Sequence, residues 1–267
     1  MSEVRAVVFD WAGTVIDFGS RAPMGVFVEA FARFGVEVSV AEARGPMGRP
    51  KWDHIAAMLA EPRIAAAWRA AQGAAPDKAA VDRIYEIFVP MNEAVVADYA
   101  TLVAGAAEAV AVLRERGCRI GSTTGYTRSI MARLLPLAAA QGFSPDNLVC
   151  AGDLAEGRPS PMNMYRTFLD LGVWPAARVV KVDDTGVGIE EGVHAGCWTI
   201  GVALSGNEAG LAPDELAALP EGERQALRER AGTALRRHGA HLVIDTVADL
   251  LPAIDAIEAR IARGERP

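Results

Sequence analysis

The strongest indication of the fold is the stretch VRAVVFDWAGT, residues 4–14. Its first half, Val4–Phe9, is a short apolar run rich in valine, which is typical of a buried strand in a parallel sheet. Asp10 follows directly, and a glycine comes three residues later. Because open α/β sheets bind ligands at the carboxyl ends of their strands, Asp10 is a candidate functional carboxylate. The alternative is an aspartate that only caps a helix or forms a turn.

Strand-like and helix-like segments alternate from Leu102 to the end of the chain. The predicted strands cover residues 118–123, 147–151, 178–182, 198–203 and 241–245. Helical patterns separate most of them, and residues 205–238 are predicted to form a loop and a charged helical excursion. This alternation predicts an α/β fold built on a doubly wound parallel sheet.

Residues 21–99 differ from the rest of the chain, because their apolar residues follow helical periodicity alone. Glycines and prolines such as Gly45-Pro46 and Pro62 break the segment into separate helices, and no strand pattern interrupts them. We therefore predict an all-helical domain, residues 21–99, inserted into an α/β core domain made of residues 1–20 and 100–267.

Composition excludes several classes of protein. The net charge of -7 argues against nucleic acid as the main partner. The three cysteines are widely spaced and form no CxxC pair, which indicates reduced thiols in a cytoplasmic protein rather than disulfides or a zinc site. We find no signal-peptide pattern at the start and no apolar stretch long enough to cross a membrane, so we expect a cytoplasmic location.

One lysine stands out. The chain has 27 basic residues, and only three of them, Lys51, Lys78 and Lys181, are lysines. Where this chain needs a positive charge it uses arginine, so a lysine hints at chemistry that arginine cannot perform. A lysine amine can lose its proton and attack a carbonyl carbon, whereas a guanidinium effectively cannot. Taken alone, Lys51 could equally be an ordinary surface residue.

Polar groups follow several predicted strands: Asp10, Thr124-Gly125, Arg158 and Asp183-Asp184. In an open parallel sheet they would gather at one edge. A carboxylate nucleophile, a hydroxyl with a loop amide, a fixed cation and a metal-binding carboxylate are what phosphoryl transfer to an aspartate requires. Mg²⁺ would suit the space between two carboxylates, because it takes oxygen ligands and bridges to phosphate oxygens.

Four segments, residues 9–14, 122–125, 158–161 and 182–185, resemble the four motifs of the haloacid dehalogenase superfamily, in the same order. This resemblance implies a Rossmann-like core with a helical cap. Residues 47–54, 120–127 and 183–192 carry a closer resemblance to one branch of that superfamily, the phosphonatases. It implies Mg²⁺-dependent hydrolysis of the carbon–phosphorus bond of phosphonoacetaldehyde, in a homodimer that assembles through cap helices.

The resemblance also assigns roles to residues. Asp10 would form an aspartyl phosphate and Lys51 a Schiff base, while Asp10, Asp184 and the Ala12 carbonyl would hold Mg²⁺. The other predicted site residues would surround the substrate: Thr124, the Gly125 amide and Arg158 at the phosphoryl oxygens, Met47 and His54 near the imine, and Tyr126 beside the substrate. Packing for Met47, a structural role for His54, and coverage of the sheet edge by Tyr126 are the alternatives.

Two positions depart from the general pattern of the superfamily. Ala12 stands where most of its phosphatases carry an aspartate that protonates the leaving group, a contribution of about 10²–10⁴-fold. An imine on Lys51 would turn the departing carbanion into a neutral enamine, so the loss of that acid and the presence of the lysine explain each other. Gly188 lies near where many relatives carry another metal-site acid. The rival interpretations are a phosphate-ester phosphatase or mutase of the same fold, and a non-catalytic binding protein.

Overall fold

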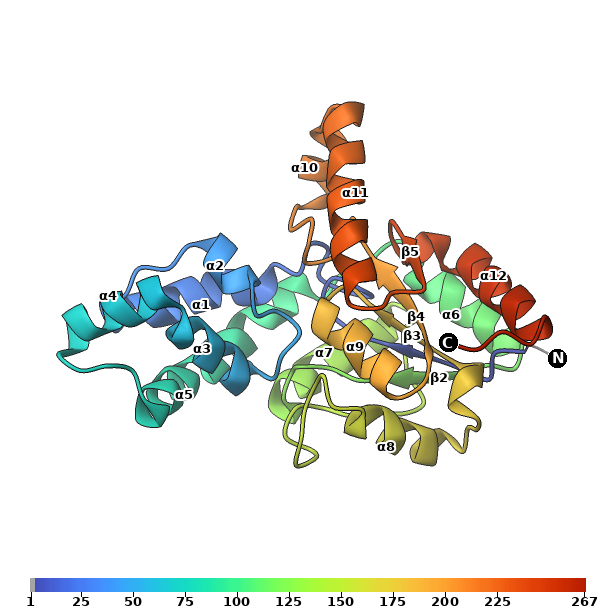
Figure 1. The fold of residues 1–267 in the computed structure, drawn as a ribbon, viewed down its shortest axis with the longest axis horizontal. Helices are drawn as coiled ribbons and strands as arrows, with labels where there is room; N and C mark the ends of the chain where they lie inside the picture. The colour runs from blue at the N-terminus through green and yellow to red at the C-terminus, as the bar shows by residue number, and fades with distance from the viewer. Residues whose placement is uncertain (1–2) are drawn as a thin grey trace.

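The structure, a computed structural model, describes residues 3–267 (Figure 1). Five parallel strands form one sheet in the order β2-β1-β3-β4-β5, which confirms the doubly wound α/β core. The strands are β1 (Ala6–Phe9), β2 (Arg119–Ser122), β3 (Val179–Asp183), β4 (Trp198–Val202) and β5 (Leu242–Ile244). Phe9 pairs with Ser122 on one side and with Val182 on the other. The residues that follow β1, β2 and β3 therefore leave the sheet at the same edge.

Helices cover both faces of the sheet, because alternate strand residues point to opposite sides. Val7 and Phe9 belong to the hydrophobic cluster that contains the buried faces of α6, α7 and α12, while Ala6 and Val8 pack with α8. Helices α9 and α11 contribute to a further small hydrophobic cluster of the core. The core helices are α6 (Ala106–Glu115), α7 (Arg128–Ala140), α8 (Met162–Leu171), η2 (Ala176–Arg178), α9 (Gly186–His194), α10 (Pro213–Ala218), α11 (Glu221–Arg237), η3 (Val247–Asp249) and α12 (Leu250–Ala262). The predicted excursion at 205–238 is thus helical, and Figure 1 shows α10 and α11 projecting from the body.

The segment between β1 and α6 is helical, as predicted. It contains α1 (Ala22–Ala32), α2 (Val40–Arg44), α3 (Lys51–Ala60), α4 (Pro62–Gln72), α5 (Lys78–Val95) and η1 (Val96–Tyr99). Ser39 and Asp77 cap α2 and α5 through their side chains. The helices enclose a hydrophobic cluster of their own and form the left-hand part of Figure 1. We call these helices the cap and the remaining elements the core; the domain boundaries at residues 21 and 99 remain a prediction.

The predicted strand at residues 147–151 is wrong. In its place the chain makes a single parallel bridge, between Thr123 and Val149. Side chains occupy the positions that a neighbouring strand would fill: Asp146 Oδ2 accepts the Ile120 N–H at 2.9 Å, and Asn147 Oδ1 accepts the Ser122 N–H at 3.2 Å. The β2 carbonyls on this edge accept backbone N–H groups instead, Ile120 from Asp146 at 2.7 Å and Ser122 from Val149 at 2.9 Å. Because side chains take the place of the backbone acceptors, a regular ladder does not form there.

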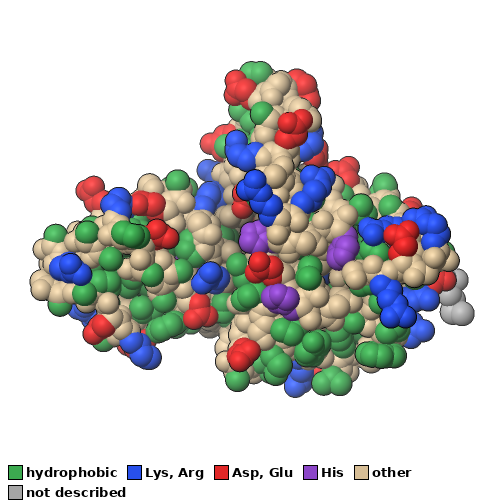
Figure 2. Space-filling model, viewed as in Figure 1, with side chains coloured by type: hydrophobic (Ala, Val, Ile, Leu, Met, Phe, Trp, Pro, Cys, Tyr) green, Lys and Arg blue, Asp and Glu red, His purple; other side chains and the backbone are tan. Residues whose placement is uncertain are grey.

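Charges of both signs are interspersed over the face of the molecule in Figure 2, on the cap, the core and the projecting helices. Within residues 3–267, every helix is too short or too polar to be a candidate for crossing a membrane.

Candidate active site

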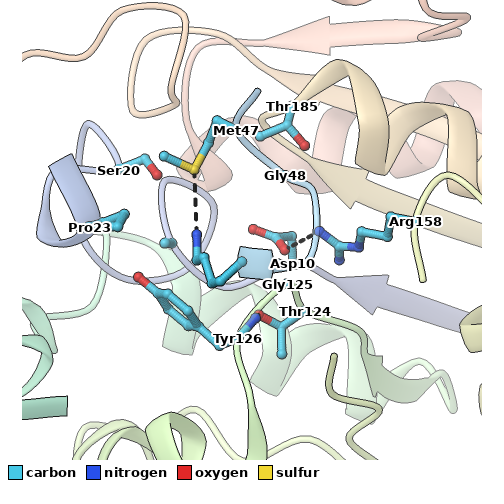
Figure 3. Close-up of a pocket in the computed structure, with 12 residues that line it drawn as sticks. Asp10, Ser20, Pro23, Met47, Gly48, Thr124, Gly125, Tyr126, Arg158 and Thr185 are labelled. Carbon is cyan, nitrogen blue, oxygen red and sulfur yellow. Dashed lines mark hydrogen bonds and ion pairs between the residues drawn. The ribbon is translucent and has the colours of Figure 1, made fainter. Parts of the chain in front are cut away.

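A cavity lies where the cap meets the carboxyl edge of the sheet (Figure 3). Residues of both parts line it. Among them are eight residues predicted from the sequence: Asp10, Ala12, Met47, Lys51, Thr124, Gly125, Tyr126 and Arg158. A ninth, Asp184, lies beside Asp10, since their carboxylate oxygens belong to a group of atoms within 4.8 Å of one another. The fold thus brings together residues that are up to 174 positions apart in the chain.

Asp10 leaves the end of β1 and is almost completely buried. Arg158 Nη1 donates a hydrogen bond of 2.7 Å to Asp10 Oδ1, which Figure 3 shows as a dashed line. Burial, with a further contribution from the Asp183 charge, raises the pKa of Asp10 to about 6, although Arg158 opposes the change. One oxygen of the carboxylate is therefore fixed by the guanidinium, which leaves the other to act on a ligand.

Lys51 is the first residue of α3 and lines the cavity, with 4% of its surface exposed. Its Nζ lies 3.8 Å from Met47 Sδ, 5.1 Å from the centre of the Tyr126 ring and 5.6 Å from that of Phe27. Burial lowers the pKa of Lys51 to about 8 and the Arg158 charge adds to this effect, although the Asp10 charge opposes it. At pH 7 about 10% of such an amine is neutral, against a negligible fraction for an ordinary lysine.

His54 is not among the described residues that line the cavity. It is fully buried one turn after Lys51, with its ring stacked on Phe27 at 4.1 Å. His54 Nε2 lies 2.8 Å from the Ala43 carbonyl oxygen, and a carbonyl only accepts, so Nε2 carries the proton. Burial and the neighbouring Lys51 charge lower the pKa of His54 well below its usual value, so the ring is neutral. Within residues 3–267 the buried Nδ1 of His54 has no hydrogen-bond partner, and the lowered pKa disfavours its protonation.

The loop after β2 supplies the opposite wall. Thr124 Oγ1 accepts the Tyr126 N–H at 3.1 Å and keeps its own hydrogen as a donor. A Cβ atom on Gly125 would lie 2.9 Å from the Arg49 carbonyl oxygen, so the cap backbone packs directly against this glycine. The position therefore excludes any side chain, and the amide of Gly125 stays at the cavity surface.

The last residue of β3 and the residue after it, Asp183 and Asp184, are buried aspartates with different surroundings. Asp184 Oδ2 accepts the Asn207 N–H at 2.7 Å, and burial and the Asp10 charge raise its pKa well above the usual value. Asp183 Oδ1 accepts both the amide and the hydroxyl of Thr185, at 3.0 and 2.7 Å. A Cβ atom on Gly188 would lie 1.9 Å from Asp183 Oδ2. Asp183 thus fills the space of any side chain at Gly188, which explains the second departure noted in the sequence.

Comparison with known proteins identifies the family. Residues 4–196 match the model of the haloacid dehalogenase-like hydrolases. Over 267 residues the chain is 57% identical to the phosphonoacetaldehyde hydrolase of Paraburkholderia xenovorans, with 100% of both chains covered. It is 49% identical to that of Bordetella avium, which covers 99% of this chain and 94% of the relative. The chain belongs to the phosphonoacetaldehyde hydrolase family.

A solved structure supports the same assignment. The crystal structure of a phosphonoacetaldehyde hydrolase like protein from Oleispira antarctica superposes with a TM-score of 0.97 at 44% identity, covering 99% of this chain and 96% of that one. As a member of the haloacid dehalogenase-like hydrolases, the chain is an enzyme and a hydrolase. The family resemblance read from the four motifs is therefore confirmed.

The carboxyl edge of this hydrolase fits a divalent cation. One oxygen each from Asp10, Asp183 and Asp184 lies within 4.8 Å of the others, and all three residues are buried. The donors are oxygen atoms only, which suits Mg²⁺ better than softer metals. Repulsion from Asp10 adds to burial in raising the pKa of Asp184, and a cation between the two carboxylates would relieve that repulsion.

The hydrolase also contains a buried ionic network that sequence reasoning missed. Lys181, in the middle of β3, places Nζ 2.8 Å from Thr123 Oγ1, 3.0 Å from Asp183 Oδ2 and 3.3 Å from Glu191 Oε2. Arg158 Nε lies 3.1 Å from the same Glu191 oxygen. The signal was available, since a lysine inside a buried strand of valines requires a buried anion nearby. The network fixes the guanidinium that holds Asp10.

Proposed function

We propose that the chain hydrolyses the carbon–phosphorus bond of phosphonoacetaldehyde to acetaldehyde and phosphate. Full-length relatives that carry the name phosphonoacetaldehyde hydrolase support the substrate. The single observation that carries the chemistry is a buried amine, Lys51, lining the same cavity as Asp10 and Ala12. A lysine with a lowered pKa serves imine formation, and the missing acid at position 12 suits a leaving group that needs no protonation.

The proposed reaction begins at Lys51. Its neutral amine attacks the aldehyde carbon, water leaves, and an imine forms. A carboxylate oxygen of Asp10 then attacks phosphorus, and the electron pair of the breaking carbon–phosphorus bond moves into the protonated imine to give a neutral enamine. Water hydrolyses the aspartyl phosphate to phosphate. The enamine takes up a proton at carbon, and hydrolysis of the resulting imine frees acetaldehyde and Lys51. Atoms and electrons balance without an oxidant or reductant.

Other side chains position the phosphoryl group in this proposal. Arg158, the Thr124 hydroxyl and the Gly125 amide would hold its oxygens, because they present a fixed cation and two hydrogen-bond donors at the cavity. Mg²⁺, held by Asp10, Asp184 and the Ala12 carbonyl, would supply charge stabilisation for those oxygens when bound. The resemblance to the phosphonatases supports a role for His54, one turn after Lys51, in proton transfer during imine chemistry, and its unpartnered Nδ1 is the atom that would take part.

Borohydride trapping tests the proposal. The enzyme is treated with phosphonoacetaldehyde and sodium borohydride, digested, and mapped by mass spectrometry. We expect loss of activity and a two-carbon or phosphonoethyl mass on the peptide that carries Lys51, while Lys78 on the surface serves as the internal control. Full activity after this treatment, or phosphatase activity on an aryl phosphate that survives replacement of Lys51, would return the chain to the ester phosphatases.

We also propose that the enzyme is a cytoplasmic homodimer. The resemblance to the phosphonatases supports assembly through cap helices, and three buried free cysteines suit a reducing compartment. Light scattering coupled to gel filtration should give a mass near twice the 28.2 kDa of the chain. A monomer at micromolar concentration would contradict the dimer and leave the proposed chemistry unaffected.

A further inference from the structure

Arg44, the last residue of α2 in the cap, is clamped onto the core. Its Nη1 donates to the Gly19 carbonyl at 2.9 Å, and to the carbonyl and side-chain oxygens of Asn207 at 3.3 and 3.2 Å. Its Nη2 donates to the Gly210 carbonyl at 3.1 Å. All four acceptors lie outside the cap helices, and three of them belong to a single core loop, at Asn207 and Gly210. The side chain can therefore make these bonds only when the cap is docked.

The core loop that accepts the hydrogen bonds of Arg44 also contacts Asp184, the proposed metal ligand. On its other side, the Asn207 N–H donates to Asp184 Oδ2 at 2.7 Å. Ser205 ties the same loop to the segment before the cap, because its carbonyl accepts the Gly19 N–H at 2.7 Å. Asn207 therefore accepts hydrogen bonds from Arg44 of the cap through its two oxygens and donates one to Asp184 of the core through its backbone N–H.

We propose that Arg44 is a positioning residue that couples docking of the cap to the orientation of Asp184, and hence to binding of a divalent cation. The inference rests on the proposed function only in taking Asp184 as a metal ligand. When the cap docks, Arg44 fixes the peptide planes of the loop at Asn207 and Gly210. Fixing this loop directs the Asn207 amide at one oxygen of Asp184 and leaves the other oxygen for the cation. Coupling of this kind is reciprocal, so the cation in turn favours the docked cap.

The first test measures metal affinity without substrate. Mn²⁺ is titrated into the metal-stripped full chain and followed by electron paramagnetic resonance, for wild type, Arg44→Met, Arg44→Lys and Arg63→Met. Arg63 is the matched control, because it is a cap arginine whose bonds to Glu42 and to the Glu37 carbonyl stay inside the cap. We expect Arg44→Met to weaken Mn²⁺ binding about 5–150-fold, the usual range of coupling between two sites. Arg44→Lys should recover part of the loss, and Arg63→Met should bind as wild type.

The second test approaches the contact from the core. A Cβ atom on Gly210 would lie 2.6 Å from Arg44 Cζ, so Gly210→Ala should displace the guanidinium and weaken Mn²⁺ binding. If it acts through Arg44, it should weaken binding much less in the Arg44→Met background, as a double-mutant cycle reveals. Proteolysis at the cap–core connections should slow when Mn²⁺ is added to wild type, and less so in Arg44→Met.

The outcomes separate this inference from the proposed function. Mn²⁺ binding by Arg44→Met equal to that of wild type, or equal weakening by Arg63→Met, would overturn the coupling and leave the imine chemistry standing. Additive effects of Gly210→Ala and Arg44→Met would overturn it as well. A wild-type protein that binds no Mn²⁺ would overturn both the metal role of Asp184 and the inference.

Discussion

Replacing Lys51 by methionine should stabilise the folded protein while abolishing carbon–phosphorus cleavage. The substitution keeps the length of the side chain, and its surroundings are apolar: Met47 Sδ and the rings of Phe27 and Tyr126. Methionine therefore fits where the ammonium group is buried at a cost. Turnover should fall by several orders of magnitude, as it does when a covalent catalyst is removed.

The size of the stability gain follows from the pKa of Lys51. Lowering this pKa from 10.5 to about 8 costs the charged folded state roughly 3 kcal/mol, since each tenfold change in proton affinity is worth about 1.4 kcal/mol. Loss of the contacts between the ammonium and the two rings offsets part of this, because a cation–π contact contributes about 0.5–2 kcal/mol. We expect Lys51→Met to raise the free energy of unfolding at pH 7 by about 1–3 kcal/mol.

The same pKa gives the prediction a pH dependence with a definite sign. Between pH 8 and 10.5 the unfolded chain still binds the proton that folded Lys51 has lost, so the stability of wild type rises with pH in this window. The advantage of Lys51→Met is therefore full below pH 8 and shrinks above it. Urea unfolding of both proteins at pH 7.0 and pH 9.5 measures this. Lys78→Met is the control, because Lys78 lies on the surface and should change stability by no more than about 0.5 kcal/mol. A Lys51→Met protein less stable than wild type at pH 7 would refute the reasoning.

Three further changes test the site. Asp10→Asn should abolish turnover with an unchanged circular dichroism spectrum, because an amide is neither a phosphorus nucleophile nor a good Mg²⁺ ligand; wild-type turnover, with deamidation excluded by mass, would contradict this role. Chelation with EDTA should stop the reaction and added Mg²⁺ restore it, and full activity after exhaustive metal removal would argue against Asp10 and Asp184 as its ligands. Lys51→Arg should keep the charge and still lose far more than tenfold in kcat, and retention of a tenth of kcat, about 1.4 kcal/mol in the barrier, would defeat the imine.

The sequence was sufficient where a local pattern dictates structure. Valine-rich runs that end in polar residues located β1 and β3, and the ends of these strands placed Asp10 and Asp184 at one edge. The same reasoning failed at residues 147–151, because the side chains of Asp146 and Asn147 accept the β2 N–H groups that the carbonyls of a neighbouring strand would otherwise accept. Residue propensities do not predict which groups will pair with the edge of a strand.

Interactions between distant segments could be predicted only in part. Lys181 in a valine-rich strand indicates a buried anion, but its links to Glu191 and Arg158 appear only once β3, α9 and the loop before α8 are assembled. The clamp of Arg44 on Asn207 joins residues 163 positions apart. The buried lysine predicts an anion nearby, but neither pair has a periodic or motif signature that names the partner, so tertiary packing alone identifies it.

Two glycines connect the fold to the chemistry of Lys51. Gly48, with φ at +89°, approaches the core so closely that a Cβ atom there would lie 2.3 Å from Thr185 Oγ1. Gly125, on the core side, packs equally closely against the cap, because a Cβ atom there would lie 2.9 Å from the Arg49 carbonyl oxygen. A side chain at either position would hold the cap loop away from the sheet and admit water to Lys51. Burial is the largest cause of the lowered pKa of Lys51. Because these glycines allow the close packing that buries the amine, they contribute to the fraction of Lys51 that is neutral. The reactivity proposed for the lysine thus depends on residues that carry no functional group at all.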